Sequence, residues 1–186
     1  CKRKYRKTSY HSSLYLNLSQ ESQPQESSSL LTRHGLSDVR ARARMRILVA
    51  DDHRVNQQLA VLMLERLGYR ADVVGNGYEA VEAIVRVPYS LIFMDCQMPD
   101  MDGFEATKAI RQREAESVKD ESFDEIRESL RVPIIAMTAN AMQGDKDKCL
   151  EAGMDDYLAK PVKSHLLEAM LVKWLPTEVS ESLGKT

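Results

Sequence analysis

Short apolar runs and helix-like patterns alternate five times between residues 45 and 175, and no other feature of the chain constrains its fold as strongly. The first run, Arg46–Ala50 (RILVA), lacks the alternation of a half-exposed strand, which is typical of a strand buried on both faces. The runs that predict the other strands are Arg70–Val74 and residues 90–94, 132–137 and 157–159. Because parallel strands need a crossover connection, we predict an α/β fold, a doubly wound five-stranded parallel sheet in the flavodoxin-like order 2-1-3-4-5 with helices on both faces.

Apolar residues at helical spacing follow each predicted strand. The first helix, which Gly68 should end, is predicted from the helical spacing of Val55, Leu59, Leu62, Met63 and Leu67. The other helices are predicted around Ala80, Val81, Ile84 and Val85, over residues 103–113 and 141–152, and around Leu166, Leu167, Met170, Leu171 and Trp174.

Polar side chains stand where the predicted strands end. Asp51 and Asp52 follow the first strand, Asp95 the third, Thr138 the fourth and Lys160 the fifth. Because ligands of such sheets bind at the carboxyl ends of the strands, we expect these five side chains to converge. Alone, the acidic pair could equally cap the next helix, and a single Thr or Lys is weak evidence. Their joint occurrence at four strand ends is what indicates a functional site.

Three carboxylates that converge repel one another, and one like-charged pair about 4 Å apart costs on the order of 4 kcal/mol at an effective dielectric constant near 20. A divalent cation removes this repulsion, and oxygen ligands favour Mg²⁺, which also accepts phosphate oxygens. The lysine ammonium and the threonine hydroxyl can bind an oxyanion. The residues therefore predict a phosphoryl-binding site with a carboxylate as the candidate nucleophile.

The motifs that carry these residues are DDHRVNQ, MDCQMPDMDGFEATKAIR and IIAMTANAMQGDKDKCLEAGMDDYLAKPV. With them, residues 45–175 resemble the response-regulator receiver domain, the CheY-like fold of two-component phosphorelays. The motifs are most similar to those of the C-terminal receiver of a eukaryotic-type hybrid sensor histidine kinase, a group that Asn56 and the dipeptide Met98-Pro99 also match. The resemblance implies a phosphoprotein of signal transduction.

By this resemblance, Asp95 accepts a phosphoryl group from a phosphohistidine, and the receiver domain itself catalyses this reaction and the later dephosphorylation. Asp52 and Asp95 would bind Mg²⁺ directly with the backbone carbonyl of Gln97. Asp51 would bind the ion through a water molecule.

The resemblance also assigns Lys160 and Thr138 to the phosphoryl oxygens. Thr138 would move inward on phosphorylation, and Tyr157 would rotate into the vacated space, so these two residues form the implied switch. The bond between Lys160 and Pro161 is expected to be cis, a form that costs X-Pro bonds only about 0.5–1 kcal/mol.

The implied partner is a histidine phosphotransfer protein or the dimerisation domain of a histidine kinase, docked beside Val55 and Leu59. We expect a parent histidine kinase whose catalytic part lies upstream of Cys1, because no Gly-rich ATP-binding motif occurs in the sequence. A stand-alone response regulator and a degenerate receiver used only for protein docking stay open as alternatives. An aspartyl phosphatase of the haloacid dehalogenase class is disfavoured because no DxDxT run follows the first strand, and a flavin binder because two aspartates would repel its phosphate.

Charge predicts three segments. Residues 1–44 hold nine Lys/Arg against three Asp/Glu, a net +6, and are Ser/Gln-rich, so we expect a linker or tail. Residues 45–176 are the predicted receiver domain, and 177–186 a polar tail. A solvated linker is favoured over nucleic-acid or membrane contact, since no aromatic platform accompanies the basic residues. Three cysteines without CxxC spacing and no apolar run of membrane-spanning length favour a cytoplasmic location, and the lack of an initiator Met suggests a piece of a longer protein.

Three features depart from the family pattern. His53 replaces a commoner Asn, and because Mg²⁺ prefers oxygen, a solvent-facing side chain is favoured over a metal ligand. Cys96 is favoured as a small buried hydrophobic residue over a redox sensor. The acidic insertion 114–131 is longer than the usual connection, and a tolerated loop extension is favoured over a role in partner discrimination. The insertion should hold a short amphipathic helix built on Phe123, Ile126 and Leu130.

Overall fold

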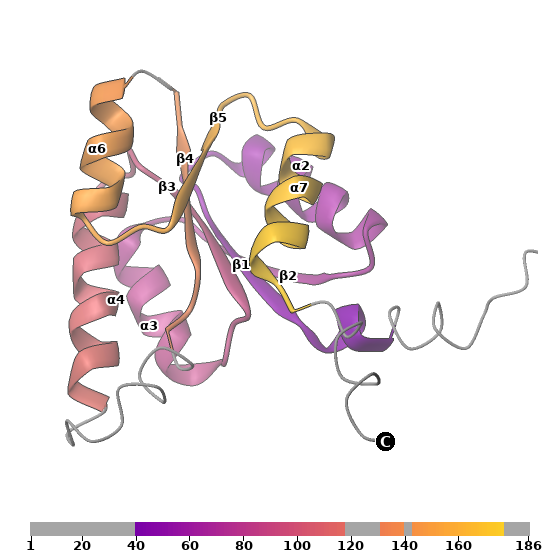
Figure 1. Cartoon of the computed structure of the whole chain (residues 1–186), viewed down its shortest axis with the longest axis horizontal. Coiled ribbons are helices and arrows are strands. Elements are labelled where there is room, and N and C mark those ends of the chain that lie inside the picture. Colours follow the sequence, from indigo (N-terminus) through magenta and orange to yellow (C-terminus); the bar gives the residue numbers. More distant parts are fainter. Residues whose placement is uncertain (1–39, 118–130, 140–142, 177–186) are drawn as a thin grey trace, which may run out of the picture. The chain divides into compact units, whose positions relative to one another are not determined.

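The computed structural model describes residues 40–117, 131–139 and 143–176. Its strands are β1 (Arg46–Ala50), β2 (Arg70–Val74), β3 (Leu91–Asp95), β4 (Ile134–Thr138) and β5 (Asp156–Ala159). Its helices are α2 (Arg54–Arg66), α3 (Gly77–Arg86), α4 (Gly103–Ser117), α6 (Gln143–Glu151) and α7 (Ser164–Trp174). All pairings are parallel and the strand order is β2-β1-β3-β4-β5, which confirms the predicted fold class and order (Figure 1).

Two hydrophobic clusters lie on opposite faces of the sheet, and each is covered by its own helices (Figure 1). One combines Leu48, Ala50, Ile92, Met94, Ile134 and Ala136 of the sheet with Ala80 and Val81 of α3, Ala106 and Ile110 of α4, and Cys149 of α6. The other combines Ile47, Val49, Leu91, Phe93, Ile135, Met137 and Leu158 with Ala60 and Leu64 of α2 and Leu167 and Leu171 of α7. Because successive residues face opposite clusters, β1, β3 and β4 read as continuous apolar runs.

The apolar residues that predict the first helix do not all face the core. Val55 is 76% exposed, Leu59 44% and Leu62 46%, whereas the buried residues of α2 are Ala60 and Leu64. The small alanine lets α2 lie close to the sheet, so the larger side chains of the adjoining face remain outside. The result is an exposed apolar face on α2, a feature that marks interaction surfaces.

Two other helices differ in detail from the prediction. The apolar stripe predicted for the second helix includes Val85, which is 65% exposed on the outer side of α3. Helix α4 continues past residue 113 to Ser117, so the insertion begins within that helix. The amphipathic helix expected around Phe123, Ile126 and Leu130 lies outside the described residues.

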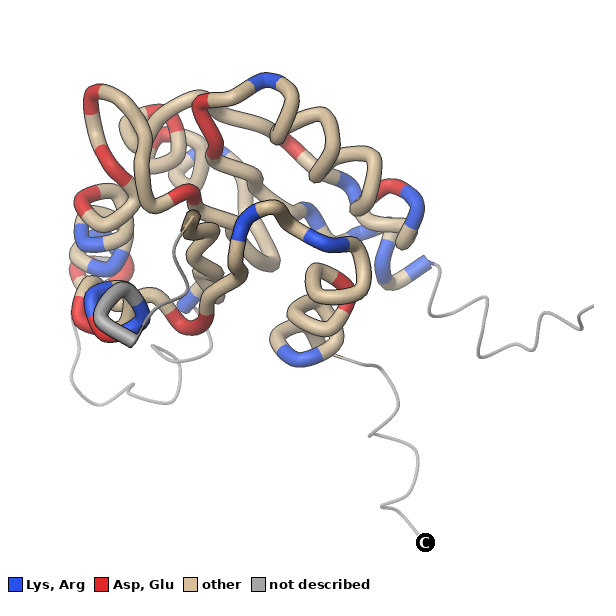
Figure 2. The backbone as a smooth tube through the Cα atoms, turned by 90° about the horizontal axis from the view of Figure 1, so that it is seen from above, with Lys and Arg blue, Asp and Glu red and all other residues tan. Residues whose placement is uncertain are grey.

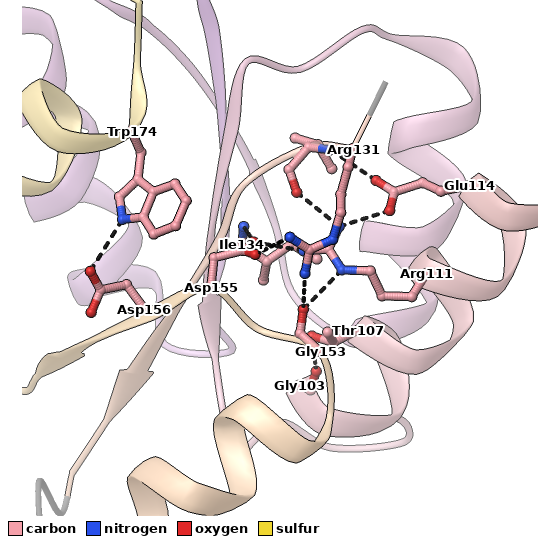
Figure 3. A network of polar contacts seen from close by, with 11 residues as sticks. Gly103, Thr107, Arg111, Glu114, Arg131, Ile134, Gly153, Asp155, Asp156 and Trp174 are labelled. Atoms are coloured by element: carbon pink, nitrogen blue, oxygen red, sulfur yellow. Dashed lines mark hydrogen bonds and ion pairs between the residues drawn. The ribbon is translucent and has the colours of Figure 1, made fainter. Parts of the chain in front are cut away.

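A buried arginine ties the base of α4 to two distant segments (Figure 3). Arg111 donates to the carboxylates of Asp155 and Glu114, each at 2.7 Å. It also donates to the backbone carbonyls of Gly153 and Val132, each at 2.9 Å. Its side chain is only 15% exposed, so it links α4, the start of β4 and the α6–β5 loop in a largely buried position.

The described chain begins in a basic stretch, which Figure 2 marks in blue beside the grey N-terminal trace. Residues 40–44 are helical. Arg42 donates to the carbonyl of Leu67 at 3.5 Å, and its guanidinium lies 5.8 Å from the centre of the Tyr69 ring. These contacts attach the residues before β1 to the body, while the domain boundary at residue 45 stays a prediction. Within the described ranges, no helix combines the length and apolarity required to cross a membrane.

Candidate functional site

The carboxyl ends of β1, β3 and β5 bring three of the predicted site residues into direct contact. The ammonium of Lys160 lies 2.8 Å from Oδ2 of Asp51 and 2.6 Å from Oδ2 of Asp95. Asp51 is 1% exposed and Asp95 5%. Residues that are far apart in the sequence thus form one buried cluster of two carboxylates and one ammonium. The bond between Lys160 and Pro161 is cis, as expected.

The loop after β3 is folded tightly around Asp95. The Gln97 N–H donates to Oδ1 of Asp95 at 3.2 Å. Helix α4 starts so close to this loop that a Cβ on Gly103 would lie 2.1 Å from the carbonyl oxygen of Asp95, so only glycine fits. Asp102 accepts the Glu105 N–H at 2.8 Å and caps α4, which is a structural role.

Two neighbouring amide side chains of α2 hold Asp51. Asn56 Nδ2 donates to both carboxylate oxygens of Asp51, at 3.1 and 3.2 Å. Gln57 Nε2 donates to the backbone carbonyl of Asp51 at 2.6 Å and to that of Val74 at 3.3 Å. The sequence interpretation used Asn56 only as a mark of the subfamily and missed both contacts. The available signal was two adjacent amides in the first turn of the helix that follows an acidic pair.

Asp52 and His53 complete the loop after β1. The His53 N–H donates to Asp51 Oδ1 at 2.9 Å, and its ring Nδ1 lies 2.6 Å from Asp52 Oδ1. His53 occupies the N-cap position of α2 without a side-chain cap, so the acidic pair is not used as the N-cap. One ligand atom each from Asp51, Asp52 and His53 lies within 4.8 Å of the others, which is a group that can hold a metal ion.

Burial and pairing shift the pKa values of the two central groups. Burial raises the pKa of Asp95 above that of an ordinary aspartate, although the hydrogen bonds from Lys160 and Gln97 act in the opposite direction. For Lys160, burial by itself lowers the pKa, but the hydrogen bonds to Asp51 and Asp95 outweigh it and raise the pKa above the usual lysine value. The ammonium therefore stays charged, and Asp95 is a more basic carboxylate than an exposed one.

The two predicted switch residues lie on β4 and β5. Thr138 is 7% exposed, and its carbonyl accepts the Lys160 N–H at 2.7 Å. Tyr157 is partly buried, and the ammonium of Lys146 lies 5.4 Å from the centre of its ring, a cation–π contact that the sequence interpretation missed.

Cys96 directly follows Asp95 and is 4% exposed, which agrees with its interpretation as a buried apolar side chain. Its Sγ lies 3.9 Å from that of Cys149, and both thiols are buried. Burial raises the pKa of Cys96 far above the usual thiol value, so the reactive thiolate is disfavoured.

Comparison with known proteins identifies the family of this chain and several relatives. The family model described as "Response regulator receiver domain" matches residues 47–119 and 120–172. The "Probable histidine kinase 1" of Oryza sativa subsp. indica is 40% identical over 151 residues, which cover 72% of this chain. The chain spans only 16% of the length of that curated relative.

Two solved structures share the fold and much of the sequence. One is the receiver domain of sensor histidine kinase PA1611 from Pseudomonas aeruginosa PAO1, with a magnesium ion coordinated in its active site cleft. It is 44% identical, with a TM-score of 0.57, over 70% of this chain and 96% of that one. The other is the receiver domain of Ssk1 in a co-crystal with the histidine phosphotransfer protein Ypd1 of Saccharomyces cerevisiae. It is 34% identical, with a TM-score of 0.62, over 70% of this chain and 88% of that one.

Proposed function

Since the chain belongs to the response regulator receiver domain family, we propose that it is the receiver segment of a hybrid histidine kinase and takes part in a phosphorelay with Asp95 as phosphoacceptor. The observation that carries this proposal is the position of the Lys160 ammonium, 2.6 Å from Asp95 and 2.8 Å from Asp51. Residues 45–176 would form the receiver domain and act in the cytoplasm, with residues 1–44 and 177–186 as flanking segments.

In the proposed reaction, an oxygen of the Asp95 carboxylate attacks the phosphorus of a phosphohistidine. The P–N bond breaks, its electron pair stays on the donor imidazole, and a new P–O bond makes Asp95 an acyl phosphate. Negative charge builds up on the transferred oxygens, and Lys160, already within hydrogen-bond distance of Asp95, can stabilise it without a large movement. The burial that raises the pKa of Asp95 also makes its carboxylate the better nucleophile.

The donor set fits Mg²⁺. The carboxylates of Asp51 and Asp95 share one ammonium, and a carboxylate oxygen of Asp52 lies within 4.8 Å of one of Asp51, so negative charge is left in excess. Bound Mg²⁺ would neutralise that charge and bind an oxygen of the incoming phosphoryl group. Each oxygen of Asp51 accepts two hydrogen bonds, whereas each oxygen of Asp95 accepts one among the described contacts. Asp52, Asp95 and the Gln97 carbonyl would therefore hold the ion directly, and Asp51 would support them.

Phosphorylation would be transmitted through Thr138 and Tyr157. The acyl phosphate adds about one unit of negative charge and new acceptor oxygens. Thr138, at the end of β4, would move to donate its hydroxyl to one of these oxygens. The ring of Tyr157 would then turn inward and leave its contact with Lys146, which changes the surface formed by α6, β5 and α7.

The proposed phosphodonor is a histidine phosphotransfer protein or the dimerisation domain of a histidine kinase. The exposed residues Val55 and Leu59 of α2 offer it an apolar surface. Leu59 also lines a pocket of about 320 Å³, together with Met63, Val162 and Lys160. An apolar side chain of the donor seated there would bring its phosphohistidine close to the buried carboxylates, because the same lysine contacts both the pocket and Asp95.

Mg²⁺-dependent transfer of labelled phosphoryl from a phosphorylated histidine phosphotransfer protein tests the proposal. The full chain is compared with Asp95→Asn and with Asp102→Asn, a matched control in the same loop whose capping role asparagine fills equally well. We expect label on the wild type and on Asp102→Asn, and none on Asp95→Asn. Label on all three would place the phosphoacceptor elsewhere. Failure of the wild type to bind Mg²⁺ or to react with a small acyl phosphate would leave only a docking module.

A further inference from the structure

We infer that His53 is a metal-ligating residue that gives this acidic site a preference for Zn²⁺ over Mg²⁺. The inference rests on the proposed function, because it concerns the same cation site. It assigns a specificity-determining role to a side chain that the phosphoryl-transfer chemistry does not use. The preference would make Zn²⁺ a competitor for the carboxylates that otherwise serve Mg²⁺.

The geometry places the imidazole at the edge of the acidic cluster. The backbone N–H of His53 is fixed on Asp51 Oδ1 at 2.9 Å, so the residue is held in the loop next to the carboxylates. Its ring Nδ1 lies 2.6 Å from Asp52 Oδ1, a spacing that a shared proton bridges here and that a shared metal ion can bridge instead. The three donor atoms of Asp51, Asp52 and His53 fall within 4.8 Å of one another. Nitrogen and oxygen donors bound at about 2.0–2.2 Å in a tetrahedral zinc site lie about 3.3–3.6 Å from one another, so small movements of the side chains would suit a single ion.

Ligand chemistry then separates the two metals. Mg²⁺ demands oxygen donors and keeps several waters, so the His53 ring, which is 72% exposed, remains in solvent when that ion is bound. Zn²⁺ binds imidazole and carboxylate together, with His and Asp as common ligands. Among divalent ions of the first transition series, affinity for such mixed sites rises toward the end of the row. A nitrogen ligand beside the carboxylates therefore favours Zn²⁺ over Mg²⁺.

The exposure of the His53 ring suits this role. The side chain is open to solvent, so it can turn toward an ion without repacking the core. Asp52, its neighbour, is partly exposed, in contrast to the buried Asp51 and Asp95. An incoming metal would thus meet Asp52 and His53 first, at the outer edge of the site. Because Asp51 is already held by Asn56 and Lys160, the outer pair has the greater freedom to adapt to the ion.

Isothermal titration calorimetry with Zn²⁺ and with Mg²⁺, on the full chain near neutral pH, tests the inference. The variants are His53→Asn and, as a matched control, His165→Asn, which removes an exposed histidine of α7. We expect His53→Asn to weaken Zn²⁺ binding by at least about tenfold, because the loss of even an outer-shell partner typically lowers metal affinity by that factor. Mg²⁺ binding should change by less than about twofold. The His165→Asn chain should retain both affinities.

NMR of the ¹⁵N-labelled His53 imidazole distinguishes a metal ligand from a residue with only a structural role. Zn²⁺ should shift the ring nitrogens of His53, and Mg²⁺ should leave them in place. Mg²⁺ binding by the wild type, with Zn²⁺ affinity unchanged in His53→Asn, would overturn the inference and leave the proposed function intact. Binding of neither ion by the wild type would instead remove the cation site itself.

Discussion

Replacing Arg111 with alanine is expected to lower the free energy of unfolding of the domain by about 3 kcal/mol. The side chain, which is 15% exposed, donates to the carboxylates of Asp155 and Glu114 and to two backbone carbonyls. A hydrogen bond to a charged group contributes about 1.5–3 kcal/mol, and loss of one partner of a buried ion pair costs about 3–5 kcal/mol. The lower part of that range applies, because Asp155 keeps two donors, the side chain of Arg131 and the Ile134 N–H.

Urea unfolding, followed by the fluorescence of the single tryptophan, Trp174, and by circular dichroism, measures the effect. With a slope of about 2 kcal/mol per molar urea, a loss of 3 kcal/mol moves the midpoint down by about 1.5 M. Arg111→Lys keeps the charge but not the fork of donors, so its midpoint should fall between those of the alanine variant and the wild type.

Arg86→Ala is the matched control, because Arg86 is 71% exposed and pairs with Glu82 on the surface of α3. Such an exposed pair contributes less than about 0.5 kcal/mol. Equal midpoints for Arg111→Ala and Arg86→Ala would refute the reasoning, since the buried network would then add nothing beyond a surface ion pair.

Three further predictions concern the site. Because burial raises the pKa of Asp95, the folded state binds a proton there more tightly than the unfolded state, and stability is lost as the pH rises through the interval between the two pKa values. Asp95→Asn should therefore be more stable than the wild type at neutral pH, by on the order of 1 kcal/mol. This difference in stability should shrink in acid. Thermal unfolding measures it, and a difference that does not depend on pH would contradict the prediction. Leu59→Ala should slow phosphoryl transfer from a phosphotransfer protein about tenfold, but it should not slow the reaction with a small acyl phosphate. Val85→Ala, which changes an exposed apolar residue of α3, is the control and should slow neither reaction. Equal slowing with both donors would argue against docking at α2. Beryllofluoride with Mg²⁺ should move the Tyr157 ring away from Lys146, and unchanged Tyr157 signals in NMR spectra would count against the switch.

The sheet was predictable because its central strands are buried on both faces. In β1, β3 and β4 consecutive residues are buried and must be apolar, so a short apolar run is enough to locate each strand. The site residues follow from the same topology: once the strands are parallel, Asp51, Asp95 and Lys160 must meet at one edge. Sequence and topology together thus located the cluster of two carboxylates and one ammonium.

The contacts that the sequence did not reveal depend on how each helix is oriented against the sheet, and not on the order of the elements. The helix α2 satisfies a helical period with either of two faces, and the choice of Ala60 and Leu64 over Leu59 depends on how closely the helix approaches the sheet. The hydrogen bonds from Asn56 to Asp51 depend on the same placement of α2. Arg111 meets Asp155 across 44 positions of the sequence, a pairing to which no local pattern points.

The hydrogen bond from the Val132 N–H to the Glu114 carboxylate, 2.9 Å long, joins the last turn of α4 to the residues that lead into β4. The ends of the intervening segment are therefore joined by the fold itself, and each doubling of the segment's length adds only about 0.6 kcal/mol of closure entropy. The five residues of β4, about 16 Å of strand, separate this junction from Thr138. The junction is thus a splice point: a foreign domain whose termini lie close together can be grafted between residues 117 and 131, at the end of the sheet opposite Asp95, to build a reporter.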